Sequence, residues 1–122
     1  MTKLEMIEKG MAAHAGWKAR LRSAINLGKF DGQVSTVRAD SLCDFGKWLY
    51  SAELSTEEKQ SEHYRAVKRL HAEFHQEAAK VVDCLTSGQK DTAEKAIGMG
   101  GTYAKASMAL TEVMVKWRES LR

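Results

Sequence analysis

The chain lacks proline altogether, has only two cysteines among its 122 residues, and contains just three each of Trp, Tyr and Phe. A composition without proline, with few β-branched residues and with many Ala, Leu, Lys, Glu and Met residues favours helix over strand. Cys43 and Cys84 do not supply the disulfide framework of a small secreted domain, and the N-terminal stretch MTKLEMIEKG lacks the apolar run of a signal peptide. We therefore expect an all-α protein in a reducing, cytoplasmic compartment.

Long apolar runs and an excess of one charge are also missing. Charged residues interrupt every apolar segment before it reaches the roughly 20 residues of a bilayer span, so no membrane association is expected. The 19 basic and 16 acidic residues give a net charge of +3 and are mixed along the chain, which argues against a nucleic-acid partner. Residues 1–122 show no linker or repeat and are enough for a single domain with its own core.

Apolar residues recur at steps of three and four along three long segments, which is the pattern of helices with one buried face. The predicted buried positions are Leu4, Ile7, Met11, His14, Lys18, Leu21 and Ile25 in the first helix, Tyr64, Val67, His71, Phe74, Ala78, Val81 and Leu85 in the next, and Ala96, Met99, Tyr103, Ala106, Leu110, Val113, Trp117 and Leu121 in the last. A short helix over about residues 40–51 is predicted between the first two. Together these helices predict an antiparallel four-helix bundle whose short helix carries Cys43.

Capping residues and glycines set the predicted helix ends. Gly28 ends the first helix and opens a polar loop to about residue 38. Ser55 and Glu58 form a capping box at the start of the second long helix, and Asp91 and Glu94 form a similar pair at the start of the last. The glycines of the GMGG stretch each cost a helix about 1 kcal/mol relative to Ala, so we expect a kink or a close helix contact there.

Three histidines fall in or beside the predicted buried faces. His71 and His75 are four residues apart on one helix, so their rings project from adjacent turns and can converge on one ion. A lone pair of this kind is more often one core and one surface histidine, but His14 independently occupies a buried position of another helix. Burying an imidazole without a partner costs roughly 1 to 3 kcal/mol, whereas a bound metal makes the same groups a source of folding energy. Cys43 could supply a fourth ligand, and three imidazoles with one thiolate suit tetrahedral zinc, favoured over copper by geometry and availability.

The same residues lie in motifs that resemble the chemoreceptor zinc-binding (CZB) domain family. His14 is followed by Trp17 on the first helix, the stretch CDFGKWLY begins at Cys43, and LHAEFH ends at His75. The resemblance covers the three ligand-bearing helices in order. It implies that His14, Cys43, His71 and His75 bind one zinc ion per chain inside a four-helix bundle.

The resemblance also implies a bacterial sensory role. Domains of this family commonly form homodimers, are attached to cytoplasmic chemoreceptors or diguanylate cyclases, and respond to zinc or to oxidants such as hypochlorous acid. No output domain is recognisable in the sequence, so we expect a stand-alone protein or a sensor module whose signalling partner is encoded elsewhere. Cys43 would then be both ligand and redox switch, because the thiolate is the form that oxidants attack, and its response would regulate chemotaxis or cyclic-di-GMP signalling.

Further residues are expected to surround the metal site. The aromatic ones are Trp17, Phe45, Trp48 and Phe74. The candidate acceptors for ligand N–H groups are Asp40, Asp44 and Glu73. Plain core packing would give the same aromatic pattern. His63 is interpreted as an exposed helix residue, and Cys84 as a small half-buried one without a function.

Catalysis is not expected from this set of residues. Four protein ligands leave no position for a reacting water, and the sequence has no HExxH motif and no glycine-rich phosphate loop. A di-iron bundle would require Glu three residues before its histidines, where Met11, Lys68 and Ala72 stand instead. The leading hypothesis is a redox-responsive zinc sensor, and the alternative is a structural or zinc-buffering interaction module without a redox response.

Overall fold

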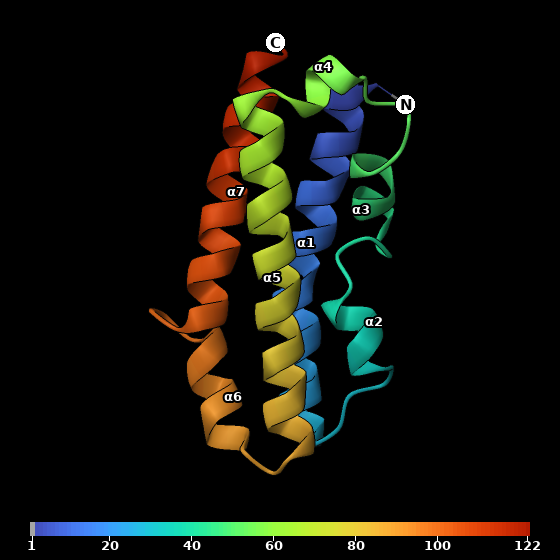
Figure 1. Cartoon of the computed structure of the whole chain (residues 1–122). Coiled ribbons are helices and arrows are strands. Elements are labelled where there is room, and N and C mark those ends of the chain that lie inside the picture. The colour runs from blue at the N-terminus through green and yellow to red at the C-terminus, as the bar shows by residue number, and fades with distance from the viewer. Residues whose placement is uncertain (1) are drawn as a thin grey trace.

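The computed structural model describes residues 2–122, and within them every regular element is a helix (Figure 1). In chain order the helices are α1 (Lys3–Leu27), α2 (Val34–Arg38), α3 (Asp44–Leu49), α4 (Thr56–Lys59), α5 (Glu62–Thr86), α6 (Lys90–Ile97) and α7 (Thr102–Ser120). The prediction of an all-α protein is confirmed. None of these helices combines the length and the apolar character that crossing a membrane requires.

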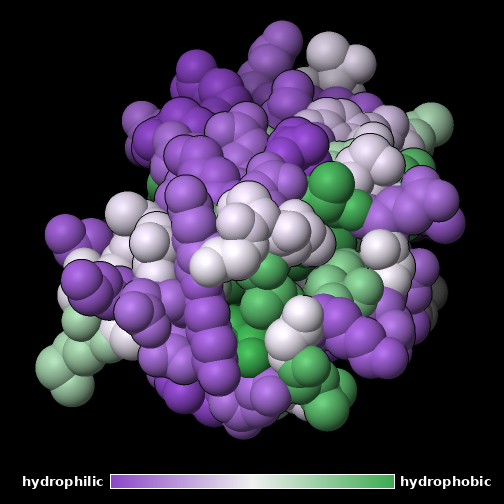
Figure 2. All heavy atoms as spheres, turned by 90° about the horizontal axis from the view of Figure 1, so that it is seen from below, coloured by the Kyte–Doolittle hydropathy of each residue, from purple (hydrophilic) through white to green (hydrophobic). Residues whose placement is uncertain are grey.

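The helices form four positions around a common core. Chain direction alternates from α1, through α2 and α3, to α5, and then through α6 and α7 (Figure 1). Helix α5 contacts α1, α2, α6 and α7, and α1 contacts α3, α5, α6 and α7. The second position of the expected antiparallel bundle is therefore filled by two short helices in succession. Figure 2 shows apolar side chains gathered in the middle of the lower end of this bundle, with hydrophilic side chains around them.

Helix α1 ends at Gly28, as the sequence predicts, and begins behind a capping box that the sequence analysis did not identify. Thr2 Oγ1 accepts a hydrogen bond from the Glu5 N–H at 3.1 Å, and the Glu5 carboxylate accepts one from the Thr2 N–H, which completes a capping box. Gly28 has φ +78° and donates its N–H to the carbonyls of Ala24 and Ile25, so the helix stops there. On the buried face Lys18 is an exception, because its side chain is exposed.

The segment between α1 and α4 differs from the sequence prediction in two ways. The expected loop up to residue 38 contains helix α2, whose Val37 is buried. The expected helix over residues 40–51 is shorter, because α3 spans only Asp44–Leu49 and Cys43 is its N-cap residue instead of lying inside it. The cysteine is thus on a turn that leads into a short helix.

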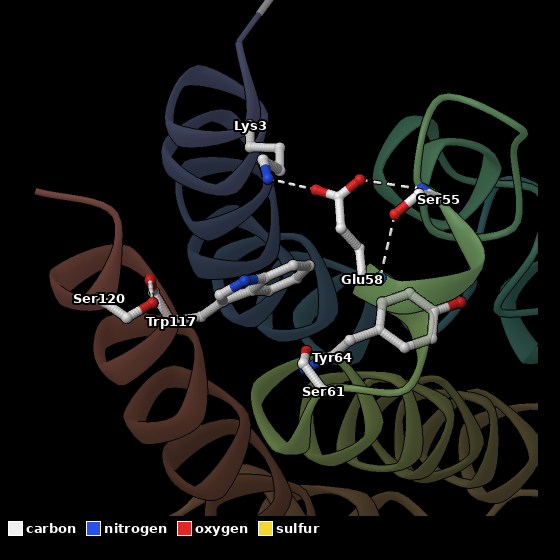
Figure 3. Close-up of polar contacts among 7 residues, drawn as sticks. All are labelled: Lys3, Ser55, Glu58, Ser61, Tyr64, Trp117 and Ser120. Carbon is white, nitrogen blue, oxygen red and sulfur yellow. Dashed lines mark hydrogen bonds and ion pairs between the residues drawn. The ribbon is translucent and has the colours of Figure 1, made fainter.

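The capping box at Ser55 and Glu58 is present, but it starts a different helix from the one predicted (Figure 3). Helix α4 ends after one turn at Lys59, and α5 begins anew behind a second cap, in which Ser61 Oγ accepts a hydrogen bond from the Tyr64 N–H at 3.2 Å. Glu58 also forms an ion pair with Lys3 of α1 (Figure 3). The prediction that the long helix starts at Ser55 is therefore wrong by one turn of helix and a break.

The C-terminal position consists of two helices. The predicted Asp91–Glu94 cap is wrong, since α6 starts at Lys90 behind Gln89 and no side chain caps it. The glycines end α6: Gly100 has φ +79°, and a Cβ on Gly101 would lie 2.1 Å from the Lys95 carbonyl oxygen, so only glycine fits there. Met99, predicted as buried, is fully exposed on the connecting loop.

Candidate metal centre

Four side chains from three parts of the chain meet inside the bundle. His14 comes from α1, His71 and His75 come from adjacent turns of α5, and Cys43 comes from the turn that caps α3. One ligand-type nitrogen or sulfur of each residue lies within 4.8 Å of those of the other three. These are the four residues that the sequence singled out as metal ligands, and they form a potential metal site.

His71 Nε2 lies at the centre of the cluster. It is 3.1 Å from His14 Nε2, 3.2 Å from His75 Nε2 and 3.4 Å from Cys43 Sγ, and His75 Nε2 is 3.5 Å from the same sulfur. Bond lengths of about 2.0–2.1 Å to nitrogen and about 2.3 Å to sulfur in a tetrahedral zinc site separate two nitrogens by about 3.3–3.4 Å, and a nitrogen from the sulfur by about 3.5–3.6 Å. These four distances are close to those of a tetrahedral ligand shell, and the remaining two pairs lie within 4.8 Å.

Hydrogen bonding alone does not satisfy these atoms. His71 Nε2 carries either one proton or one lone pair, yet it faces three polar atoms, so an ordinary hydrogen bond satisfies only one of these contacts. A cation shared by all four residues would accept every lone pair that points into the cluster, so the residues present fit a metal ion.

The family of the chain follows from comparison with known proteins. The model of the chemoreceptor zinc-binding domain matches residues 14–82, which is more than half of the chain and includes all four residues of the cluster. The chain belongs to this family. No curated protein and no solved structure matches it. Because the family is a zinc-binding sensory domain, zinc is the metal that the cluster of this CZB domain fits.

Burial sets the protonation of the cluster in the CZB domain. Desolvation, helped by the nearby His75, lowers the pKa of His14 to about 4, and it lowers the pKa of His71 to about 2. Desolvation also lowers the pKa of His75, and it raises the pKa of the Cys43 thiol. All three imidazoles are thus neutral at pH 7, which is the form that binds metal, whereas the thiol needs a nearby cation to lose its proton.

Helix α2, which lies where the sequence predicts a loop, orients one of the three imidazoles. The Val37 carbonyl of α2 lies 2.9 Å from His75 Nδ1 and accepts its hydrogen bond. This contact fixes the ring so that Nε2 points at the cluster, as second partners of metal-bound histidines do. A backbone carbonyl leaves no signal in a sequence, so sequence reasoning could not have found this acceptor.

The predicted aromatic residues lie at different distances from the cluster. Phe74 and Phe45 pack edge-on against His14, with ring centroids 5.1 and 5.6 Å from its ring. Trp17 is half-buried beside Cys43, and Trp48 lies one layer further out, between Phe45 and Trp117, with its ring tilted relative to both. Direct contact with the imidazoles thus comes from the two phenylalanines.

The structure places the three candidate acidic acceptors away from the imidazole N–H groups. Asp40 accepts a hydrogen bond from the Tyr50 hydroxyl, and Glu73 is exposed and pairs with Arg69 at 3.8 Å. Asp44 is exposed in the first turn of α3. His75 instead uses the main-chain carbonyl described above.

Two glycines allow close packing around α3, one against the turn of Cys43 and one against the Phe45 ring. A Cβ on Gly46 would lie 1.8 Å from the Asp40 carbonyl oxygen, so the turn of residues 40–43 folds directly onto the backbone of α3. The Gly46 N–H also donates to Cys43 Sγ at 3.3 Å. On α1, a Cβ on Gly10 would lie 2.5 Å from the Phe45 ring. Neither of these contacts can be located from the sequence, although the FGKW stretch draws attention to the first glycine.

Solvent reaches the cluster at Cys43. A cavity of about 350 Å³ and a second of about 110 Å³ are both lined by Cys43 and Trp17. The three histidines are buried and Cys43 is partly exposed. Cys43 is therefore the only residue of the four that is partly exposed and that lines both cavities, within the part of the chain that the structure describes.

Proposed function

We propose that this CZB domain is a sensor in which His14, Cys43, His71 and His75 hold one zinc ion and Cys43 responds to oxidants. The observation that carries the proposal is the difference in exposure within the cluster, where three histidines are buried, Cys43 is partly exposed, and Cys43 lines two cavities. A purely structural site gains nothing from such an opening. A sensor requires it, because the oxidant has to reach the sulfur from solvent.

The four residues of the cluster differ in how they reach the protonation state that binds metal. The three imidazoles are neutral without assistance, whereas burial holds the Cys43 thiol protonated. Bound zinc supplies the positive charge that keeps this sulfur a thiolate. The thiolate gives an electron pair to hypochlorous acid, chloride leaves, and the hydroxyl group remains on the sulfur as a sulfenic acid.

Oxidation of Cys43 acts on the least supported part of the fold. Cys43 caps α3, a helix of six residues that is too short to persist without tertiary contacts. A sulfenic acid is a poorer metal ligand than a thiolate, so the turn of residues 40–43 loses its attachment to α5. We expect α3 and this turn to loosen first, because their local opening costs least.

We further propose that the domain works as a cytoplasmic homodimer and passes this change to a signalling partner in bacterial chemotaxis or cyclic-di-GMP control. The family's description as a chemoreceptor domain supports such an output. The break between α6 and α7 and the two short helices in the second position offer places where a local change alters packing.

The test uses zinc-loaded protein carrying Cys84→Ser, so that Cys43 is the one remaining thiol. One equivalent of hypochlorous acid should release zinc and raise hydrogen exchange in residues 40–49, with little change in the centre of α5. The variant Cys43→Ser, which keeps Cys84, should lose most of its zinc before any oxidant is added, so it serves as the control for hydrogen exchange alone. Its exchange in residues 40–49 should not change on addition of the oxidant. Met99 and Met108 are exposed and compete for the oxidant, so peptide mass spectrometry has to locate the added oxygen.

The alternative, a structural or zinc-buffering site, predicts a different result. In that case oxidation leaves zinc occupancy and hydrogen exchange of residues 40–49 unchanged, even where mass spectrometry shows oxygen on the methionines. That outcome would remove the redox response from the proposed function and leave only the zinc site.

A further inference from the structure

The larger of the two cavities beside Cys43 has the character of a binding site. Its volume is about 350 Å³, within the range of small-molecule sites. It lies between α1, the α1–α2 connection, α2 and the turn before α3. The lining residues are Trp17, Arg20, Phe30, Gly32, Gln33, Thr36, Val37, Leu42, Cys43 and His75. Apolar walls thus surround a few polar groups, and two members of the metal cluster form part of the lining.

Arg20 is the charged group of this cavity. Its guanidinium carbon lies 4.4 Å from the Trp17 ring centroid and 4.9 Å from that of Phe30, within cation–π distance of both. One N–H contacts the Asp31 carbonyl oxygen at 3.5 Å. Arg20 forms no ion pair with a carboxylate in the part of the chain that the structure describes. The two rings therefore hold a positive charge that no carboxylate neutralises by direct contact.

The second cavity offers no comparable charge. It is smaller, at about 110 Å³, and its lining includes Lys9 and Asp44, which carry opposite charges. Both cavities reach Cys43, but only the larger one has a positive group without a negative one in its lining. An anion that approaches Cys43 should therefore be attracted more strongly through the larger cavity, which Arg20 lines, than through the smaller one.

We propose that the 350 Å³ cavity is a recognition site for small anions on their way to Cys43, and that Arg20 selects their charge. This deepens the proposed function, on which it rests, because it names the class of species that the cavity attracts toward the sensing cysteine: small monoanions such as hypochlorite, the conjugate base of the hypochlorous acid with which Cys43 reacts. Trp17 and Phe30 are positioning residues, since they hold the guanidinium at the cavity wall.

The test compares two thiol reagents of similar size and opposite charge on zinc-loaded protein with Cys84→Ser. The anion is 2-sulfonatoethyl methanethiosulfonate and the cation is 2-(trimethylammonio)ethyl methanethiosulfonate. In both, the Cys43 sulfur attacks the thiosulfonate sulfur, a disulfide forms and methanesulfinate leaves. The rate of each reaction is followed by intact mass, and the ratio of the anion rate to the cation rate is the readout.

Arg20→Gln should lower this ratio about three- to tenfold, because it slows the reaction of Cys43 with the anionic reagent and speeds the reaction with the cationic one. Arg22→Gln is the matched control, since Arg22 is exposed on α1, lines neither cavity and removes the same charge from the chain. Arg20→Lys, which keeps the charge but changes the stacking, should leave the ratio within about twofold. Circular dichroism and zinc content verify that each variant is folded and loaded.

Three results would overturn the proposal: an unchanged ratio in Arg20→Gln, an equal fall in Arg22→Gln, or no reaction of Cys43 with either reagent. These outcomes are separate from those of the oxidant experiment. A cysteine that reacts with the expected charge preference but whose oxidation leaves zinc bound would refute the sensor and keep the anion site.

Discussion

Gly46 should strengthen zinc binding although it binds no metal. In Gly46→Ala the new Cβ would start 1.8 Å from the Asp40 carbonyl oxygen, and such contacts essentially never fall below 3.0 Å. The carbonyl therefore has to move by about 1.2 Å or more, and it belongs to the turn that carries Cys43. Metal–ligand distances tolerate only about 0.2 Å, so the sulfur cannot keep its place while the turn shifts.

We expect Gly46→Ala to weaken zinc binding about 10- to 100-fold, the range for changes just outside a ligand shell. A tenfold loss corresponds to about 1.4 kcal/mol. Competition with a chelator of known affinity measures the change directly. The overpacked turn should also lower the free energy of unfolding of the metal-free protein by about 1–3 kcal/mol.

Gly16→Ala is the matched control for this substitution. Gly16 lies in the middle of α1, is exposed, and has open space where the Cβ would be placed. It should raise the free energy of unfolding by about 0.5–1 kcal/mol, as Gly to Ala does in a helix interior, and leave zinc affinity unchanged. Zinc affinity of Gly46→Ala equal to that of the wild type would refute the role of the close contact.

Three further substitutions test other parts of the structure. Gly10→Ala would place a Cβ 2.5 Å from the Phe45 ring, so urea unfolding should show a loss of about 1–3 kcal/mol, and no loss would show that the ring moves freely. Gly101→Ala would clash with two carbonyl oxygens of α6 and should lower Tm without changing zinc content; reduced zinc would indicate coupling to the cluster. The hydrogen bond from Lys3 lowers the pKa of Glu58 to about 2, so the folded state favours the carboxylate. The stabilisation that ionised Glu58 gives the folded state is present above about pH 4.5 and is lost as pH falls toward 2. In Glu58→Gln the free energy of unfolding should therefore change less between pH 4.5 and 2 than in the wild type. An equal pH dependence in the two proteins would contradict the ion pair.

Periodicity made the helices and the cluster predictable. His14 and His71 stand where an apolar residue is expected, and that conflict between side chain and position identifies them from the sequence alone. The spacing of His75 from His71 and the aromatic stretch around Cys43 added the other two. Long helices repeat their pattern often enough for such exceptions to stand out.

The parts that could not be predicted depend on short segments and on the backbone. Helix α2 has five residues, too few to show a period, and its contribution to the site is the Val37 carbonyl. The break at Gln60 replaces one long helix by two, each with its own serine cap, so a correct capping box pointed to the wrong helix. The role of Gly46 depends on the turn that brings the Asp40 carbonyl, six residues earlier, against α3, and the sequence does not show where this carbonyl lies.

The most direct test of the account is the zinc content and donor set of the purified protein. We predict one zinc per chain in the wild type, with an X-ray absorption spectrum of three nitrogen donors and one sulfur donor. Cys43→Ala should remove the sulfur contribution and most of the zinc, whereas Cys84→Ala should change neither. Zinc retained at one per chain after His14, Cys43, His71 and His75 are all replaced would contradict the central claim.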